Sequence, residues 1–151
     1  MLEIPANRYS ILLADDDLDD CMFFKDALQE LPIATSLAVV NNGVDLMNFL
    51  KRDPIHLPHQ LFLDLNMPLK KGIECLSEIK HHENLKELPV IIYSTSLNQE
   101  VVELLYKNGA QYYIKKPADF KDLKSVINKA LLLSKWEEII QPPKEEFVIQ
   151  P

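Results

Sequence analysis

The stretch LLADDDLDD, residues 12–20, sets an apolar run directly before a cluster of carboxylates. Five of the six positions from 15 to 20 are aspartate, and no lysine or arginine lies within the cluster. The apolar run is typical of a buried strand, so the first aspartates would stand at its carboxyl end. Because like charges at this spacing repel, the cluster needs a counter-charge from elsewhere in the chain or from a bound cation.

Similar short apolar runs recur along the chain, and each is followed by a longer segment with helical periodicity. Strands are predicted at residues 9–14, 35–40, 61–64, 89–93 and 112–115. Helices are predicted at residues 18–31, 44–51, 72–82, 98–108 and 119 to about 134. The strands are almost continuously hydrophobic, as in a sheet buried on both sides. The alternation therefore predicts an α/β fold with a parallel sheet covered by helices on both faces.

Composition limits the class of protein. A chain of 151 residues suits one domain with its own core. The net charge of −7 and the scattered lysines disfavour direct binding to nucleic acid. We find neither a membrane-spanning apolar stretch nor a signal peptide, and we expect a cytoplasmic protein with no membrane partner. Cys21 and Cys75 lack metal-binding or redox spacing and are predicted to be buried free thiols.

Polar residues stand where the predicted strands end. Ligands of an open parallel sheet bind at the carboxyl ends of its strands. Asp15 and Asp16 end the first strand, and Asp64 ends the third. The hydroxyl-bearing residues 94–96 end the fourth strand, and the lysines at 115–116 end the fifth. We therefore expect three carboxylates, a hydroxyl and an ammonium group to meet at one edge of the sheet.

This set of groups favours phosphoryl chemistry. Mg²⁺ is the natural counter-charge, because it takes carboxylate oxygens and retains waters. A carboxylate beside Mg²⁺ and a lysine can attack phosphorus, since both cations neutralise the transferring group. The other aspartates have a milder role. Asp17 is predicted to be the N-cap of the following helix, with Asp19 and Asp20 in its first turn.

The segments LLADDD, LFLDLNMPLKKG, IIYSTS and YYIKKP resemble, in order and spacing, the four signature segments of the response-regulator receiver domain. The resemblance implies a five-stranded sheet in the order 2-1-3-4-5, flanked by five helices. We place the domain at residues 1–138 and a C-terminal tail at residues 139–151. The end of the tail, QPPKEEFVIQP, cannot continue a helix and is either disordered or packed along the surface. Trp136 is predicted to anchor the last helix or the tail.

The resemblance also implies roles for the residues at the strand ends. Asp64 matches the aspartate that accepts a phosphoryl group from a histidine kinase or a phosphotransfer protein. Asp15 and Asp16 match the acidic pair that holds Mg²⁺, and Asp64 and the backbone carbonyl of Asn66 match its further ligands. Ser94 matches the hydroxyl that moves toward the phosphoryl group and acts as a switch.

Tyr113 in the fifth predicted strand and Lys116 directly after that strand complete the implied set. Lys116 matches the lysine that pairs with the phosphoryl group, because the family's lysine directly precedes a proline; the Lys116–Pro117 bond is then expected to be cis. Tyr113 matches an aromatic switch residue that swings inward on activation, although Tyr113 or its neighbour Tyr112 could simply belong to the core.

We predict a stand-alone response regulator of a two-component system or phosphorelay, because no output domain is expected after the receiver. Phosphorylation would bias a surface made by the fourth helix, fifth strand and fifth helix toward a downstream protein or a second copy. The start LADDDLDD, the long loop before the third strand and the STS run resemble regulators that serve phytochrome-type and hybrid kinases.

Two other functions stay open. One is a scaffold of the same fold that works without phosphorylation. The other is an aspartate-based phosphohydrolase, a class that usually has a second acid two residues after its nucleophile. Asn66 takes that position here and cannot transfer protons. On the reading we favour, the protein catalyses only its own phosphotransfer and dephosphorylation.

Overall fold

The structure, a computed structural model, describes residues 8–133 and 141–151. In these residues a five-stranded parallel sheet runs in the order β2-β1-β3-β4-β5. The strands are β1 (Tyr9–Ala14), β2 (Thr35–Val40), β3 (Gln60–Leu63), β4 (Val90–Ser94) and β5 (Tyr112–Lys115). The helices are α1 (Leu18–Gln29), α2 (Gly43–Arg52), α3 (Gly72–His81), α4 (Gln99–Lys107), α5 (Phe120–Leu133) and the short 3-10 helix η1 (Lys144–Glu146). The predicted fold class and strand order are confirmed.

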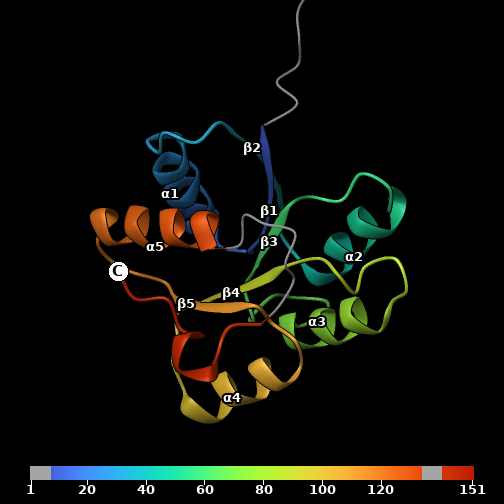
Figure 1. The fold of residues 1–151 in the computed structure, drawn as a ribbon. Helices are drawn as coiled ribbons and strands as arrows, with labels where there is room; N and C mark the ends of the chain where they lie inside the picture. The colour runs from blue at the N-terminus through green and yellow to red at the C-terminus, as the bar shows by residue number, and fades with distance from the viewer. Residues whose placement is uncertain (1–7, 134–140) are drawn as a thin grey trace, which may run out of the picture.

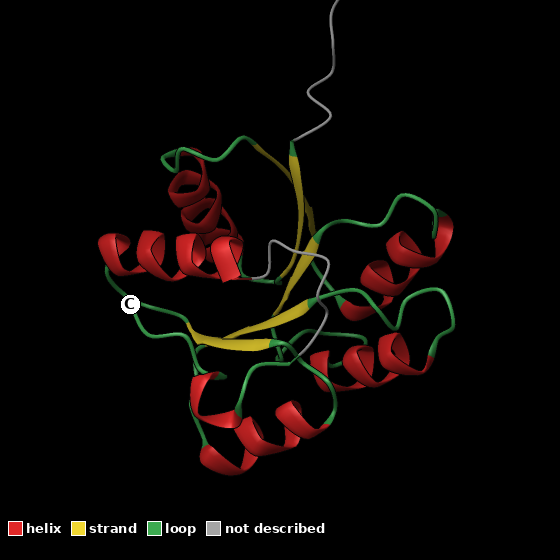
Figure 2. Ribbon diagram, in the orientation of Figure 1, coloured by secondary structure: helices red, strands yellow, loops and turns green. Residues whose placement is uncertain are grey.

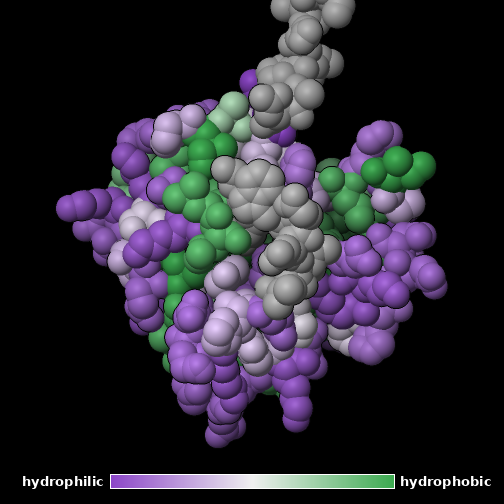
Figure 3. Space-filling model, in the orientation of Figure 1, coloured by the Kyte–Doolittle hydropathy of each residue, from purple (hydrophilic) through white to green (hydrophobic). Residues whose placement is uncertain are grey.

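The helices form two layers around the sheet. Helices α1 and α5 cover one face, and α2, α3 and α4 cover the other (Figures 1 and 2). This arrangement follows from right-handed crossovers between parallel strands. The outer surface in Figure 3 is largely hydrophilic, with apolar side chains gathered over α1 and α5.

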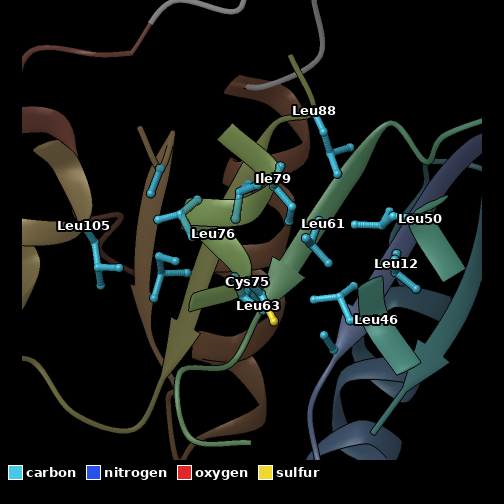
Figure 4. Close-up of a cluster of buried hydrophobic side chains, with 14 of the residues drawn as sticks. Leu12, Leu46, Leu50, Leu61, Leu63, Cys75, Leu76, Ile79, Leu88 and Leu105 are labelled. Carbon is cyan, nitrogen blue, oxygen red and sulfur yellow. The ribbon is translucent and has the colours of Figure 1, made fainter. Parts of the chain in front are cut away.

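Each strand contributes side chains to both hydrophobic layers. In β1, Leu12 packs toward α2 and α3, whereas Ile11 and Leu13 pack toward α1 and α5. In β3, Leu61 joins the first layer and Phe62 the second. Figure 4 shows the first layer, in which leucines of β1, β3, α2 and α3 point toward one another. Burial on both faces explains why the strands lack the alternation of apolar and polar residues.

The strand register brings the predicted site residues to the same edge. Ala14 of β1 pairs with Leu63 of β3, so Asp15 and Asp64 follow side by side. Ser94 is the last residue of β4 and pairs with Lys115 of β5, directly before Lys116.

The structure corrects one prediction and adds detail to others. No peptide bond of the described ranges is cis, so the cis Lys116–Pro117 bond was a wrong expectation; trans is the lower-energy form of such a bond, and Lys116 reaches the carboxylates with it. Residues 141–151 pack on the body, as the second of the two alternatives for the tail required. Trp136 and the domain boundary at residue 138 lie outside the described residues.

Candidate functional site

Three carboxylates meet beyond the ends of β1 and β3. Asp15, Asp16 and Asp64 each offer an oxygen, and these oxygens lie within 4.8 Å of one another. This is the one group of potential metal ligands found in residues 8–133 and 141–151. Asp15 is fully buried and Asp64 is 5% exposed, whereas Asp16 faces solvent. The arrangement is therefore open on one side, where a cation and a second reactant could enter.

Backbone amides hold the two buried carboxylates in place. The Asp17 N–H donates to Asp15 Oδ1 at 3.0 Å, and the Asn66 N–H donates to Asp64 Oδ1 at 3.3 Å. Asp17 also accepts from the Asp20 N–H, which confirms its predicted N-cap role. The loop after each strand thus turns back on the carboxylate that ends it.

Lys116 supplies positive charge that balances part of the aspartate cluster. Its Nζ lies 2.7 Å from Asp15 Oδ2 and 3.5 Å from Asp64 Oδ2. It also lies 5.1 Å from the centre of the Tyr93 ring. The side chain of Lys116 is 8% exposed, whereas its neighbour Lys115 is exposed. The structure thus places Lys116, rather than Lys115, among the carboxylates.

A fourth carboxylate, which the sequence analysis did not assign to the site, holds the same lysine. Asp20 Oδ2 lies 2.9 Å from Lys116 Nζ. Asp20 is in the first turn of α1, where side chains point back toward the helix N-terminus and hence toward the strand end. That direction is the signal that could have identified Asp20 in advance.

Burial and neighbouring charges shift the pKa values of Asp15 and Lys116 in opposite directions. Burial raises the pKa of Asp15 to about 6, although the Lys116 ammonium and the Asp17 amide both favour its charged form. Burial alone would lower the pKa of Lys116, but the hydrogen bonds with Asp15 and Asp20 raise it above its ordinary value. Lys116 therefore stays charged at neutral pH, while Asp15 takes up a proton more readily than an ordinary aspartate.

The predicted switch residues form a chain that leads away from this cluster. Ser94 is fully buried, and its Oγ accepts from the Ser96 N–H at 3.3 Å. Tyr113 is also fully buried, and its hydroxyl donates to the Ser96 carbonyl oxygen at 2.6 Å. The Lys116 N–H donates to the Ser94 carbonyl oxygen at 2.7 Å. A backbone segment of three residues, 94–96, thus links the hydroxyl of Ser94 to the ring of Tyr113.

The loop after β3 is tightly constrained. Leu69 has a φ of 69°, an unusual left-handed conformation for a leucine. A Cβ on Gly72 would lie 2.3 Å from the Asp64 carbonyl oxygen and 2.8 Å from the Leu65 Cα. Only glycine lets the start of α3 approach the backbone of Asp64 this closely.

The substitution Gly72→Ala should therefore destabilise the protein by roughly 1–3 kcal/mol, because the added methyl group must displace backbone atoms. Urea unfolding measures the effect. Lys71→Ala is the matched control, since Lys71 is exposed and adjacent. Equal midpoints for Gly72→Ala and the wild type would mean that the close approach is absent in solution.

The two cysteines add no charged group to the site, although the Cys21 thiol donates to the Asp15 carbonyl oxygen at 3.4 Å. Cys21 and Cys75 are buried and unpaired, as predicted. Burial raises the pKa of each thiol to about 11. Thiols in this state are poor nucleophiles.

The sequence and the fold match a known family. A family model described as the response regulator receiver domain matches residues 11–128. The chain belongs to this family. The receiver is 31% identical to response regulator Rcp1 of Synechocystis over 88% of this chain and 92% of Rcp1.

Solved structures agree with this assignment. The phosphorylated cyanobacterial phytochrome response regulator RcpA is similar to the receiver with a TM-score of 0.78 and 27% identity, over 87% of this chain and 96% of RcpA. The Mn²⁺-bound form of Rcp1 gives a TM-score of 0.74 and 30% identity, over 89% of this chain and 99% of Rcp1. The receiver is thus a signalling domain of the two-component type. No helix in its described ranges has the length and apolarity to cross a membrane.

Proposed function

We propose that this receiver is a stand-alone response regulator that accepts a phosphoryl group on Asp64 from a histidine kinase or a phosphotransfer protein. The observation that carries the proposal is the position of Asp64, beside two further carboxylates and 3.5 Å from the Lys116 ammonium. Similarity to phytochrome and bacteriophytochrome response regulators favours a phytochrome-type kinase as the donor. Output would pass to a downstream protein or to a second copy.

The donor atoms fit Mg²⁺. Asp15, Asp16 and Asp64 would hold the ion, with the backbone carbonyl of Asn66 as a further ligand. Three carboxylates with one shared lysine leave a local excess of negative charge, which a hard divalent cation with oxygen ligands would balance. A relative, Rcp1, has been crystallised with Mn²⁺. When bound, the ion supplies positive charge to the oxygens of the transferring group.

The protein's own groups have distinct tasks in the transfer. The ionised Asp64 carboxylate forms an oxygen–phosphorus bond as the phosphorus–nitrogen bond of the donor histidine breaks. Lys116 stabilises negative charge on the phosphoryl oxygens, since its ammonium group already lies beside Asp64. The Ser94 hydroxyl would turn to a phosphoryl oxygen, and the linked Tyr113 would report that movement to the surface of α4, β5 and α5.

Exposed apolar side chains near the site suit a docking partner. Leu18 and Met22, at the start of α1, are 68% and 65% exposed. Leu69, in the loop after Asp64, is 76% exposed. Large apolar side chains exposed beside a reactive group are a common feature of protein interfaces. We assign these residues to the contact with the phosphodonor protein.

The double substitution Leu18→Ala/Met22→Ala should slow phosphotransfer from the partner kinase by about tenfold, because truncated apolar contacts weaken docking. The rate with acetyl phosphate, which needs no docking surface, should stay unchanged. Time courses with both donors measure the two rates. Leu132→Ala is the control, since Leu132 is 52% exposed near the C-terminal end of α5. Equal slowing with both donors would contradict a docking role.

Acetyl phosphate tests the proposed function directly. In the presence of Mg²⁺, intact-protein mass should show one phosphoryl adduct, and borohydride reduction followed by peptide mapping should locate it at Asp64. A chelator should prevent labelling. If no adduct forms and beryllofluoride with Mg²⁺ leaves the spectrum of the protein unchanged, the phosphorylation-independent scaffold becomes the better explanation.

A further inference from the structure

The C-terminal segment, residues 141–151, lies along the open edge of the sheet. The Tyr113 N–H donates to the Phe147 carbonyl oxygen at 3.0 Å, and the Ile149 N–H donates to the Tyr113 carbonyl oxygen at 2.9 Å. These bonds form a parallel bridge between Tyr113 and Val148. The segment thus occupies the hydrogen-bonding edge that β5 would otherwise offer to another strand.

Apolar side chains fix the segment in place. Phe147 is fully buried and joins the layer under α2, α3 and α4, whereas Ile149 is 6% exposed and joins the layer under α1 and α5. The ring of Phe147 lies 5.1 Å from that of Tyr106 and 6.3 Å from that of Tyr113, edge to face in both pairs. The segment is therefore part of the core and not a loose extension.

Polar contacts attach the same segment to the helices on either side of β5. The Tyr106 hydroxyl donates to the Pro142 carbonyl oxygen at 2.8 Å, and Lys144 pairs with Glu103 of α4 at 2.9 Å. On the other side, Lys129 of α5 donates to the Gln150 carbonyl oxygen at 2.8 Å. In Figure 1 the red C-terminal segment runs between α4, β5 and α5. The segment therefore forms part of the surface made by α4, β5 and α5.

Tyr113 connects the segment to the phosphorylation site. Its backbone bonds to residues 147 and 149, its ring meets Phe147, and its hydroxyl donates to the Ser96 carbonyl oxygen. Ser96 in turn donates its N–H to the Ser94 hydroxyl. Because Tyr113 is fully buried in this arrangement, an outward movement of its ring would require Phe147 to shift or leave.

We infer that the C-terminal segment is an intramolecular strand whose docking on β5 is linked to the phosphorylation of Asp64 through the buried position of Tyr113. The inference rests on the proposed function. Docking holds Tyr113 inward, and a phosphoryl group that draws Ser94 inward favours the same position of Tyr113. Linkage is reciprocal, so docking should strengthen binding at Asp64 by the same factor by which a ligand at Asp64 strengthens docking.

Beryllofluoride with Mg²⁺, used as a phosphoryl mimic, tests this coupling in the full chain. In the wild type, its binding should slow hydrogen exchange of the Tyr113 amide. The variant Phe147→Ala/Ile149→Pro removes the buried ring and one backbone donor. It should speed exchange at Tyr113 and weaken beryllofluoride binding by about fivefold or more. Glu145→Ala is the matched control, since Glu145 is exposed in the same segment.

Several outcomes would overturn the inference. The measurement on the wild type does not depend on whether the variant folds. Rapid exchange of the Tyr113 amide in the wild type would mean that the segment is not docked. If the double variant exchanges the Tyr113 amide faster but binds beryllofluoride with unchanged affinity, docking of the segment and binding at Asp64 are independent. If protection of the Tyr113 amide increases with protein concentration, the docked segment belongs to a second copy. Failure of the wild type to bind beryllofluoride at all would instead contradict the proposed function.

Discussion

Asp64→Asn should abolish the phosphoryl adduct formed with acetyl phosphate and Mg²⁺. An amide has no negative charge with which to attack phosphorus, and no other carboxylate in the cluster has the same surroundings. Asp15 is fully buried behind Lys116, and Asp16 faces solvent. Intact-protein mass measures the adduct. The fold should persist, because the substitution removes one of several mutually repelling charges.

The control for this experiment is Asp26→Asn, which alters an exposed aspartate of α1 outside the cluster. Asp26→Asn should be labelled like the wild type. An adduct of undiminished yield on Asp64→Asn would show that another side chain is the nucleophile. The assignment of Asp64 would then be wrong even though the family and the fold stand.

Asp15→Asn should make the protein more stable and insensitive to metal. In the wild type, burial raises the pKa of Asp15 from 3.8 to about 6. The folded state therefore binds a proton more tightly than the unfolded state, and stability falls as pH rises from about 4 to 6. Above that range the full destabilisation by the charged Asp15, on the order of 1–3 kcal/mol, is present. Asparagine carries no charge to bury, and its carbonyl oxygen can accept from either the Asp17 N–H or the Lys116 ammonium group.

Thermal unfolding between pH 4 and pH 8, with and without Mg²⁺, measures both effects. The unfolding temperature of the variant should exceed that of the wild type at pH 7.5. The difference between the two temperatures should shrink toward pH 4. Mg²⁺ should stabilise the wild type but not the variant, because it binds the folded state through Asp15. In the wild type this stabilisation should fade as pH drops through about 6, where protons compete for Asp15. A variant less stable than the wild type at pH 7.5 would contradict this view.

Much of the site followed from the sequence because each candidate residue ends a strand. Strand ends are marked by the change from apolar to polar residues, and parallel strands share one carboxyl edge. Asp15, Asp64, Ser94 and Lys116 were located by that rule together with the resemblance to receivers, and the structure brings these residues to the same edge. Their predicted roles in phosphorylation await the experiments above.

The contacts that escaped the sequence analysis depend on tertiary structure. The pairing of Asp20 with Lys116 joins residues 96 positions apart, and the acid also has a local explanation at the helix start. The docking of Phe147 depends on a run of three apolar residues, too short to tell a strand from an irregular segment. Whether such a run packs, and where, depends on the edge of β5 and on the rings of Tyr106 and Tyr113.

The covered edge of β5 has a practical consequence for work with shortened chains. Removing the C-terminal segment would bare an unpaired strand edge together with the aromatic side chains of Tyr106 and Tyr113. Exposed strand edges with apolar neighbours promote aggregation and strand exchange. Dimers or precipitates seen with such a truncated form would therefore reflect the missing segment, and only the longer chain is suited to measuring how this protein assembles.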